Sequence, residues 1–220
     1  PCDTDRFDAS YVHLFVYNQQ DSAIIGAYRM GQTDLILEKE GIDGLYLSRM
    51  FDFKPDFINR QRPCLEMGRS FIIPEYQRSF HGLFLLWRGI GEFVCRFPHY
   101  RTLYGTVSIS KLYASKSVDI IRHTLLLPDL NVEAKWPFEQ ATNPELLEFL
   151  AKHKTNGELA SLIVKGVEGD KELPILLKQY QKLGARFYSI GIDRNFNDTP
   201  GLLLSVDLPT APPKALKQYL

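Results

Sequence analysis

An acid, a glycine and a base stand close together inside an apolar stretch of the sequence, at Glu66, Gly68 and Arg69. Residues 71–73 favour a pleated, half-buried surface, and Pro74 ends the run because proline cannot donate a ladder hydrogen bond. In a regular strand, residues three apart point to opposite faces, but a bulge at Gly68 would bring both charged side chains onto one face. The pattern therefore predicts a bulged strand, splayed from its neighbour, with unpaired backbone groups beside a cleft that an extended amide ligand can fill.

Two interpretations of the charged pair are about equally supported by these residues. A carboxylate and a guanidinium in a cleft are typical of a functional site. The same two groups can also form a buried ion pair that has no part in any reaction.

A polar loop and a strongly apolar helix follow the predicted strand. Ser79 is a candidate N-cap, and from Phe80 to Phe97 apolar side chains cover most of the helix circumference. A strand, a donor-rich loop and a helix N-terminus together can bind phosphate through backbone N–H groups and the helix dipole. The alternative is an ordinary strand-to-helix connection, which is the commoner case when nothing else points to a ligand.

The elements that must position these residues mix strands and helices. Strands are predicted at 11–18, 24–29, 64–73, 102–109, 159–165, 186–192 and 202–208. Helices are predicted at 33–39, briefly after Pro55, and at 79–97, 110–127, 144–153 and 171–183, whereas 127–144 has no clear period. The strand–helix–strand–helix run over 64–127 is expected to hold any donor ligand.

Composition agrees with one enzyme-sized domain, because 220 residues of which 45% are hydrophobic can bury a substantial core. The 26 basic and 26 acidic side chains balance, which argues against a general affinity for nucleic acid. An acidic partner would need a local basic patch, for which the candidates are Arg78, Lys111, Lys116 and Arg122.

Three cysteines, Cys2, Cys64 and Cys95, lack the spacing of a metal site and leave at least one thiol unpaired. A reducing, cytoplasmic compartment is therefore expected. No run of about 18 apolar residues is present, which argues against a membrane-spanning helix within these residues. Because Pro1 is not a natural start, we expect an upstream segment, which is also the part that would carry any peripheral attachment to the inner face of a membrane.

Five segments, 26–31, 65–70, 76–78, 85–90 and 104–110, resemble the ornithine lipid synthase branch of the GNAT-fold acyltransferases, whose members often carry the label hemolysin. The resemblance continues over 173–185 and 193–207, so it extends over nearly the whole chain. This branch is related to long-chain N-acyl amino acid synthases. It is more distantly related to acyl-homoserine lactone synthases, which carry a Glu and an Arg three residues apart on the corresponding strand.

The resemblance implies that residues 1–220 form a single GNAT-like α/β (α+β) domain, the C-terminal part of a longer chain. Its central sheet would be mixed, mostly antiparallel and flanked by helices, with the bulge opening the acyl-donor cleft. The implied reaction moves a long-chain acyl or hydroxyacyl group from acyl carrier protein to the amino group of an amino acid or similar amine, in aminolipid biosynthesis. The donor would be the phosphopantetheine thioester of the carrier protein or acyl-CoA, with no permanently bound cofactor and no metal.

Such a reaction needs a base for the ammonium group, alignment of the nucleophile and stabilisation of an oxyanion. Glu66 is the expected general base, acting directly or through water, since burial raises the pKa of a carboxyl group. Arg69 and Arg29 are expected to orient the acceptor through its carboxylate. Asp34 would bind the amine or cap a helix, and the cap is the simpler interpretation.

Donor binding is assigned to the loop and to the end of a later strand, at Arg78, Ser79, His81, Gly82, Ser108 and Ser110. Ser110 is also the natural N-cap of the next helix, and a loop role for His81 is favoured over catalysis because no orienting partner is evident. His13 is treated as structural. An acyl tunnel would be lined by Phe84 and Trp87 together with Phe80 and Leu83, unless these residues only fill the core.

One departure from the family concerns the loop 77–82, which does not fit the pyrophosphate motif Gln/Arg-x-x-Gly-x-Gly/Ala. His81 stands where the first glycine is expected. The departure favours the single phosphate of a carrier protein over coenzyme A. Two alternatives remain open, a non-catalytic module that binds an acyl chain or a carrier protein, and an acetyl-CoA-dependent N-acetyltransferase.

Overall fold

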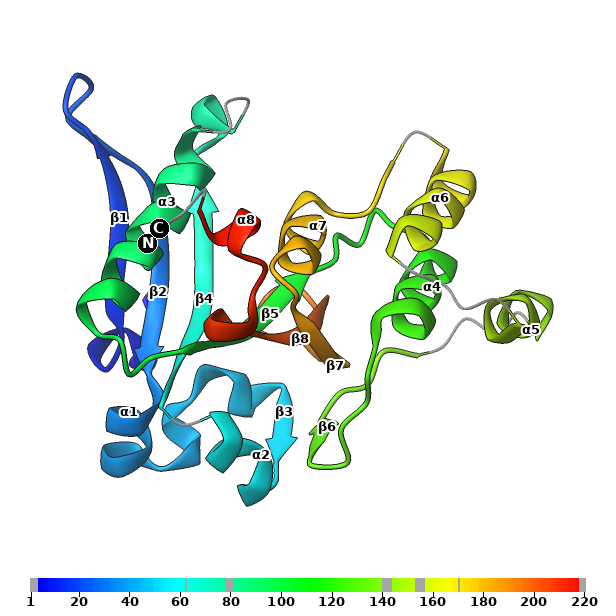
Figure 1. Ribbon diagram of the computed structural model, residues 1–220, viewed down its shortest axis with the longest axis horizontal. Coiled ribbons are helices and arrows are strands. Elements are labelled where there is room, and N and C mark those ends of the chain that lie inside the picture. Colours follow the sequence, from blue (N-terminus) through cyan, green and yellow to red (C-terminus); the bar gives the residue numbers. More distant parts are fainter. Residues whose placement is uncertain are drawn as a thin grey trace. The chain divides into compact units, whose positions relative to one another are not determined.

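The computed structural model describes residues 4–61, 63–77, 81–139, 144–152, 157–169 and 171–217 (Figure 1). The strands are β1 (Val12–Asn18), β2 (Ala23–Gln32), β3 (Phe51–Phe53), β4 (Cys64–Ile72), β5 (Thr102–Ser108), β6 (Val132–Ala134), β7 (Arg186–Asp193) and β8 (Thr199–Asp207). The α-helices are α1 (Thr33–Glu40), α2 (Pro55–Gln61), α3 (His81–Arg96), α4 (Ser115–Leu125), α5 (Pro144–Lys152), α6 (Gly157–Glu168), α7 (Ile175–Lys182) and α8 (Pro213–Leu216). Short 3-10 turns include η1 (Arg6–Ala9) and η3 (Tyr46–Arg49).

Six strands form one sheet in the order β1-β2-β4-β5-β8-β7, and β3 pairs with β6 separately. The β1–β2, β2–β4 and β7–β8 pairs are antiparallel, and the β4–β5 pair is parallel. This confirms the predicted α+β class with a mixed, mostly antiparallel sheet. The chain divides into two compact units: unit 1 comprises Pro1–Ser48, Asn59–Gly105 and Val206–Leu220, and unit 2 comprises Arg49–Ile58 and Thr106–Ser205.

In unit 1, helix α3 lies on one face of the sheet and closes the core (Figure 1). The core residues are Tyr28, Met30, Leu65, Met67, Leu86, Ile90, Tyr100 and Leu103. At Gly89 the helix approaches β1 closely, because a Cβ there would lie 2.9 Å from the methyl groups of Leu14. The helix and the strand can therefore pack at close distance.

The opposite face of this part of the sheet carries polar and exposed apolar side chains in successive rows. His13 pairs with Arg29, which pairs with Gly68 on β4. In the next row, Phe15 pairs with Ala27 and Ala27 with Phe71, and Phe15 and Phe71 are about half exposed. The face that lacks α3 is thus where the predicted charged residues gather.

The predicted bulge is present, but one residue later than expected. Between the pairs Arg29–Gly68 and Ala27–Phe71, a single residue of β2 faces two residues of β4, Arg69 and Ser70. Arg69 has a φ of +47°, in the left-handed region that favours glycine. Its guanidinium forms an ion pair with Asp5, which is described below. This contact offsets part of the free energy that the left-handed backbone costs.

The parallel pairing of β4 with β5 is short. It runs from Cys64–Thr102 to Met67–Gly105, directly before the bulge, while β4 continues to Ile72 beside β2. Gly105 allows the close approach here, because a Cβ would lie 2.4 Å from the carbonyl oxygen of Met67.

In unit 2, α4 begins at Ser115 rather than at the predicted 110, and its N-cap residue Ala114 has no capping side chain. The capping acceptor comes instead from α6, because one carboxylate oxygen of Glu168 accepts hydrogen bonds from the Ala114 N–H and the Ser117 hydroxyl, each 2.6 Å long. These hydrogen bonds, above all that from Ser117, hold the pKa of Glu168 below its usual value. An acceptor 51 residues from Ser117 thus takes the place of the expected local cap.

Three other predictions about unit 2 are corrected. The predicted strand 159–165 is part of helix α6, in which Ala160 and Val164, four residues apart, are fully buried. Helix α7 begins at Ile175 rather than 171, because the preceding Pro174 disfavours helical backbone at the residue before it. The stretch 127–144 contains the short strand β6. The predicted cap Ser79 lies outside the described residues.

Candidate functional site

Glu66 lies at the centre of the predicted site, on β4 and only 2% exposed. One carboxylate oxygen accepts the Leu47 N–H at 2.8 Å. The other accepts the hydroxyls of Tyr11 at 2.9 Å and Tyr104 at 3.2 Å. All of these partners belong to unit 1, so the carboxylate joins β4, β5, the residue before β1 and the turn η3.

Burial raises the pKa of Glu66 from its ordinary 4.5 to about 7. The hydrogen bonds from Leu47, Tyr11 and Tyr104 act in the opposite direction, as does the positive charge of Arg29. Burial and the neighbouring Glu66 also raise the pKa of both Tyr11 and Tyr104, so both phenols remain hydrogen-bond donors. The carboxyl group therefore changes its charge near neutral pH, which is the property a general base requires.

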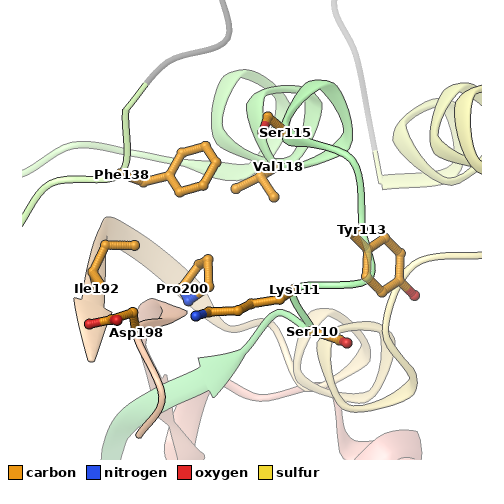
Figure 2. A pocket seen from close by; sticks show the side chains of 9 residues that line it. All are labelled: Ser110, Lys111, Tyr113, Ser115, Val118, Phe138, Ile192, Asp198 and Pro200. Carbon is orange, nitrogen blue, oxygen red and sulfur yellow. The ribbon is translucent and has the colours of Figure 1, made fainter. Parts of the chain in front are cut away.

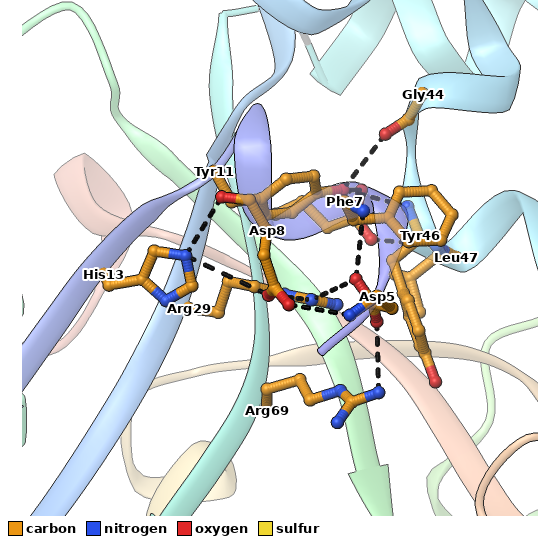
Figure 3. Close-up of polar contacts among 11 residues, drawn as sticks. Asp5, Phe7, Asp8, Tyr11, His13, Arg29, Gly44, Tyr46, Leu47 and Arg69 are labelled. Atoms are coloured by element: carbon orange, nitrogen blue, oxygen red, sulfur yellow. Dashed lines mark hydrogen bonds and ion pairs between the residues drawn. The ribbon is translucent and has the colours of Figure 1, made fainter. Parts of the chain in front are cut away.

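Arg29 is buried beside this carboxylate but its hydrogen bonds go elsewhere. Its Nη1 donates to one oxygen of Asp5 and one oxygen of Asp8, both at 2.7 Å (Figure 3). Its guanidinium also lies 5.0 Å from the ring centre of Tyr11 and 5.2 Å from that of Tyr46. In this structure the predicted acceptor-binding arginine is held by two carboxylates of the chain itself.

Arg69 shares one of these partners. Its Nη2 donates to the second oxygen of Asp5 at 3.0 Å, and about a third of its side chain is exposed. Asp5 thus joins the two predicted arginines, as Figure 3 shows. The structure brings Glu66, Arg29 and Arg69 onto one face of the sheet, as the bulge hypothesis requires.

The acidic residues Asp5 and Asp8 were not predicted, nor were the tyrosines that bind Glu66. Asp5 accepts the Phe7 N–H while Asp8 accepts the Asp5 N–H, which is the reciprocal geometry of a capping box. The Asp-x-x-Asp spacing is the sequence signal that points to this turn. Nothing local in the sequence identifies Tyr11 and Tyr104 as partners of Glu66, since they are 55 and 38 residues away.

Asp34 does not cap α1. Gln32 occupies the N-cap position, and Asp34 lies in the first turn. Its carboxylate accepts the Tyr100 hydroxyl at 2.9 Å. Thr33 instead bonds to the backbone of Cys64 through its hydroxyl. Binding of an amine by Asp34 stays a prediction.

The residues assigned to the donor lie at several places. His81 and Gly82 form the first turn of α3, in which Phe84 is half-buried and Trp87 is 6% exposed. Arg78 and Ser79 lie outside the described residues. In unit 2, Ser108 ends β5 and is exposed, and Ser110 accepts the Leu112 N–H in the turn before α4.

A cavity of about 290 Å³ opens in unit 2 at the start of α4 (Figure 2). Its lining consists of Ser110, Lys111, Tyr113, Ser115, Val118, Phe138, Ile192, Asp198 and Pro200. Of the predicted basic patch, Lys111 lines this cavity, while Arg122 donates to the Phe138 carbonyl oxygen at 2.6 Å.

The left-handed backbone at Arg69 gives a testable expectation. Relative to Arg69→Ala, Arg69→Gly is expected to raise the free energy of unfolding by about 1 kcal/mol, because only glycine adopts a positive φ without cost. Both variants lose the contact with Asp5, so their difference isolates the backbone contribution. Equal urea midpoints for the two variants would contradict the assigned conformation.

Within the described part of the chain, no group of three or more His, Cys, Asp or Glu side chains is placed to hold a metal ion. No helix among the same residues is long and apolar enough to cross a bilayer.

Comparison with known proteins gives one family. Residues 1–88 match the model of the acetyltransferase (GNAT) domain. This segment contains Glu66, Arg29, Arg69 and the acidic turn that holds the arginines. None of the curated proteins compared matches the chain.

Two solved structures are similar in outline. The CoA-dependent acyl-homoserine lactone synthase BjaI, with SAM and isopentyl-CoA, has a TM-score of 0.45 at 10% identity, over 98% of this chain and 65% of that one. An aminoglycoside 6'-N-acetyltransferase complexed with coenzyme A has a TM-score of 0.41 at 12% identity, over 92% of this chain and 76% of that one. The chain thus spans just under two thirds of the length of the synthase. At these TM-scores neither structure supports a conclusion about function.

Proposed function

We propose that the chain is an acyltransferase that moves an acyl group from a thioester to an amine. The proposal is carried by Glu66, a buried carboxyl group with a pKa of about 7 that lies on the bulged strand β4, within the segment matching the GNAT domain. A base that titrates near neutral pH is suited to deprotonating an ammonium nucleophile.

In the proposed reaction, the ammonium group of the acceptor loses a proton to the Glu66 carboxylate. The amine nitrogen then attacks the thioester carbonyl carbon, a C–N bond forms, and the C–S bond breaks. The nitrogen of the adduct gives up its second proton and the departing thiolate takes one up, so that the products are an amide and a free thiol. Because Glu66 is 2% exposed, the proton would reach it through a water molecule or through the hydroxyl of Tyr11.

For the donor, we propose a long-chain acyl group on acyl carrier protein and, for the acceptor, an amino acid or similar amine. This finer assignment is supported by the resemblance of residues 65–70 and 104–110 to the ornithine lipid synthase branch. It is also supported by the loop 77–82, which lacks the glycines of a pyrophosphate-binding motif.

A second candidate function is a non-catalytic module that binds an acyl chain or a carrier protein. One observation favours it: both oxygens of Glu66 and the Nη1 of Arg29 already have partners within the chain. A purely structural role for this buried network would leave no group to perform the reaction. The two candidates differ in whether an amide product forms.

The test compares acetyl-CoA, palmitoyl-CoA and a hydroxyacyl carrier protein as donors, each with a panel of amino acids, and detects amide by mass spectrometry. Each buried methylene contributes about 0.8 kcal/mol, so a long-chain donor is expected to exceed acetyl-CoA in kcat/KM by roughly 100-fold or more. Turnover of acetyl-CoA alone would contradict the long-chain assignment. Saturable binding of the long-chain donor without any amide would favour the binding module.

A further inference from the structure

The cavity in unit 2 has a lining whose chemistry the proposed function does not explain. Lys111 belongs to the turn before α4, and Asp198 to the turn that joins β7 to β8. Figure 2 shows the Lys111 side chain extended along the cavity toward the turn that carries Asp198. Val118, Phe138 and Ile192 supply apolar surface between these ends.

The two charged side chains are available to a ligand. Among the described residues, neither Lys111 nor Asp198 forms an ion pair, with each other or with a third group. Other charged groups nearby are already paired, as Glu168 is with Lys171 and Glu172 is with Lys178. The cavity therefore presents one cation and one anion from separate segments.

The backbone around Asp198 forms a tight turn at the edge of the cavity. Asn197 and Asp198 both have left-handed backbone, with φ of +52° and +47°, and the Thr199 N–H bonds to the Phe196 carbonyl oxygen at 3.1 Å. Two successive positive φ values define the tight turn that suits a hairpin, and Asn and Asp tolerate it best among residues other than glycine. Asp198 thus lies in a tight turn at the end of the short connection between β7 and β8.

Size and charge together restrict the ligand. A volume of about 290 Å³ is at the lower end for ligand pockets, which fits a small metabolite rather than a coenzyme. A phosphate group would be repelled by the carboxylate of Asp198. It would also be repelled at the nearby N-terminus of α4, where the Glu168 carboxylate already accepts the hydrogen bonds. A ligand that carries both charges avoids these repulsions.

We propose that this cavity binds a small α-amino acid as its zwitterion, with Lys111 contacting the carboxylate, Asp198 the ammonium group, and the apolar lining the side chain. This binding stands by itself.

The test uses the whole chain and three probes of similar size. L-Alanine is compared with propionate, which lacks the amine, and with isopropylamine, which lacks the carboxylate, by isothermal titration calorimetry and ligand-observed NMR. Alanine is expected to bind at least tenfold more tightly than either single-charge probe. Lys111→Met and Asp198→Asn should each weaken alanine binding at least tenfold.

Matched controls are Lys182→Met and Glu133→Gln, which remove an exposed lysine and an exposed acid of unit 2 outside the cavity lining. Both should leave alanine affinity within twofold, and circular dichroism should report the same fold for all four variants. Equal binding of alanine and propionate, or alanine affinity unchanged in Lys111→Met and Asp198→Asn, would overturn the inference. Because no donor is present in these assays, failure of acyl transfer with alanine binding intact would overturn only the proposed function.

Discussion

Replacement of Arg29 by methionine is expected to lower the free energy of unfolding by about 3 kcal/mol. The guanidinium side chain is 3% exposed and is the cation that both Asp5 and Asp8 contact through a single Nη1. Its removal leaves Asp5, 14% exposed, with only the more exposed Arg69 as a counterion, and takes from Asp8, 28% exposed, its contact with a guanidinium. Their residual exposure places the expected loss at the lower end of the range for a broken buried ion pair.

The measurement is the urea midpoint and slope at constant pH, with Arg69→Met as the matched control. Arg69 contacts the same Asp5, but its side chain is 32% exposed, so its loss should cost less than about 1 kcal/mol. Methionine at position 69 keeps a Cβ and so leaves the backbone contribution unchanged. If Arg29→Met and Arg69→Met lose similar amounts of unfolding free energy, the buried Arg29 contributes no more to stability than the exposed Arg69, and the prediction is wrong.

The second large effect is a pH dependence of stability that Glu66 introduces. Burial raises its pKa to about 7 in the folded state, against 4.5 for the exposed group. Between these values the folded chain binds more protons than the unfolded chain, so stability falls as pH rises from about 4.5 to 7. The loss across this window amounts to about 3 kcal/mol, at 1.36 kcal/mol for each pKa unit.

Glu66→Gln should remove this slope, because the amide does not titrate. The variant is expected to be less stable than the native chain at pH 5, where its NH2 group meets buried hydrogen-bond donors, and to lose that disadvantage as pH rises above 7. Denaturant unfolding at pH 5, 6, 7 and 8 measures the difference. If the native chain and Glu66→Gln differ in unfolding free energy by the same amount at every pH from 5 to 8, the Glu66 carboxyl group is ionised over that whole range, which would contradict the prediction.

The same variant tests the proposed chemistry. If Glu66 is the general base, Glu66→Gln should lower kcat by roughly 100- to 10,000-fold and abolish the rise of the rate near pH 7, while the fold is retained. A chain that only binds acyl groups would show unchanged donor affinity and no amide with either residue. Unchanged turnover in Glu66→Gln would exclude Glu66 as the base.

Several elements could be predicted from the sequence because their signals are local. The alternating exposure of β1 and the apolar surface of the helix between Phe80 and Phe97 are set by side-chain periodicity. The bulge was expected from a glycine between two charges, and it occurs one residue away, at Arg69. The helix α6 was mistaken for a strand because a short apolar run fits both periods.

The site could be predicted only in part. Glu66, Arg29 and Arg69 were selected by residue type, since charge in an apolar run needs a partner. Their actual partners could not be selected, because Asp5 lies 64 residues before Arg69 and Tyr11 lies 55 residues before Glu66. No local pattern in a sequence reports which distant side chains will meet.

The sequence alone, through its patterns and the family it resembles, predicted an α+β chain whose strand 64–73 carries a carboxylate and a guanidinium beside a bulge. Only the tertiary structure decided that Glu66 is hydrogen-bonded to two tyrosines and a backbone N–H, and that Asp5 and Asp8 hold the arginines. The reason is physical: periodicity encodes which face of an element is buried, whereas ion pairs and pKa values depend on distances between segments that are far apart in the chain.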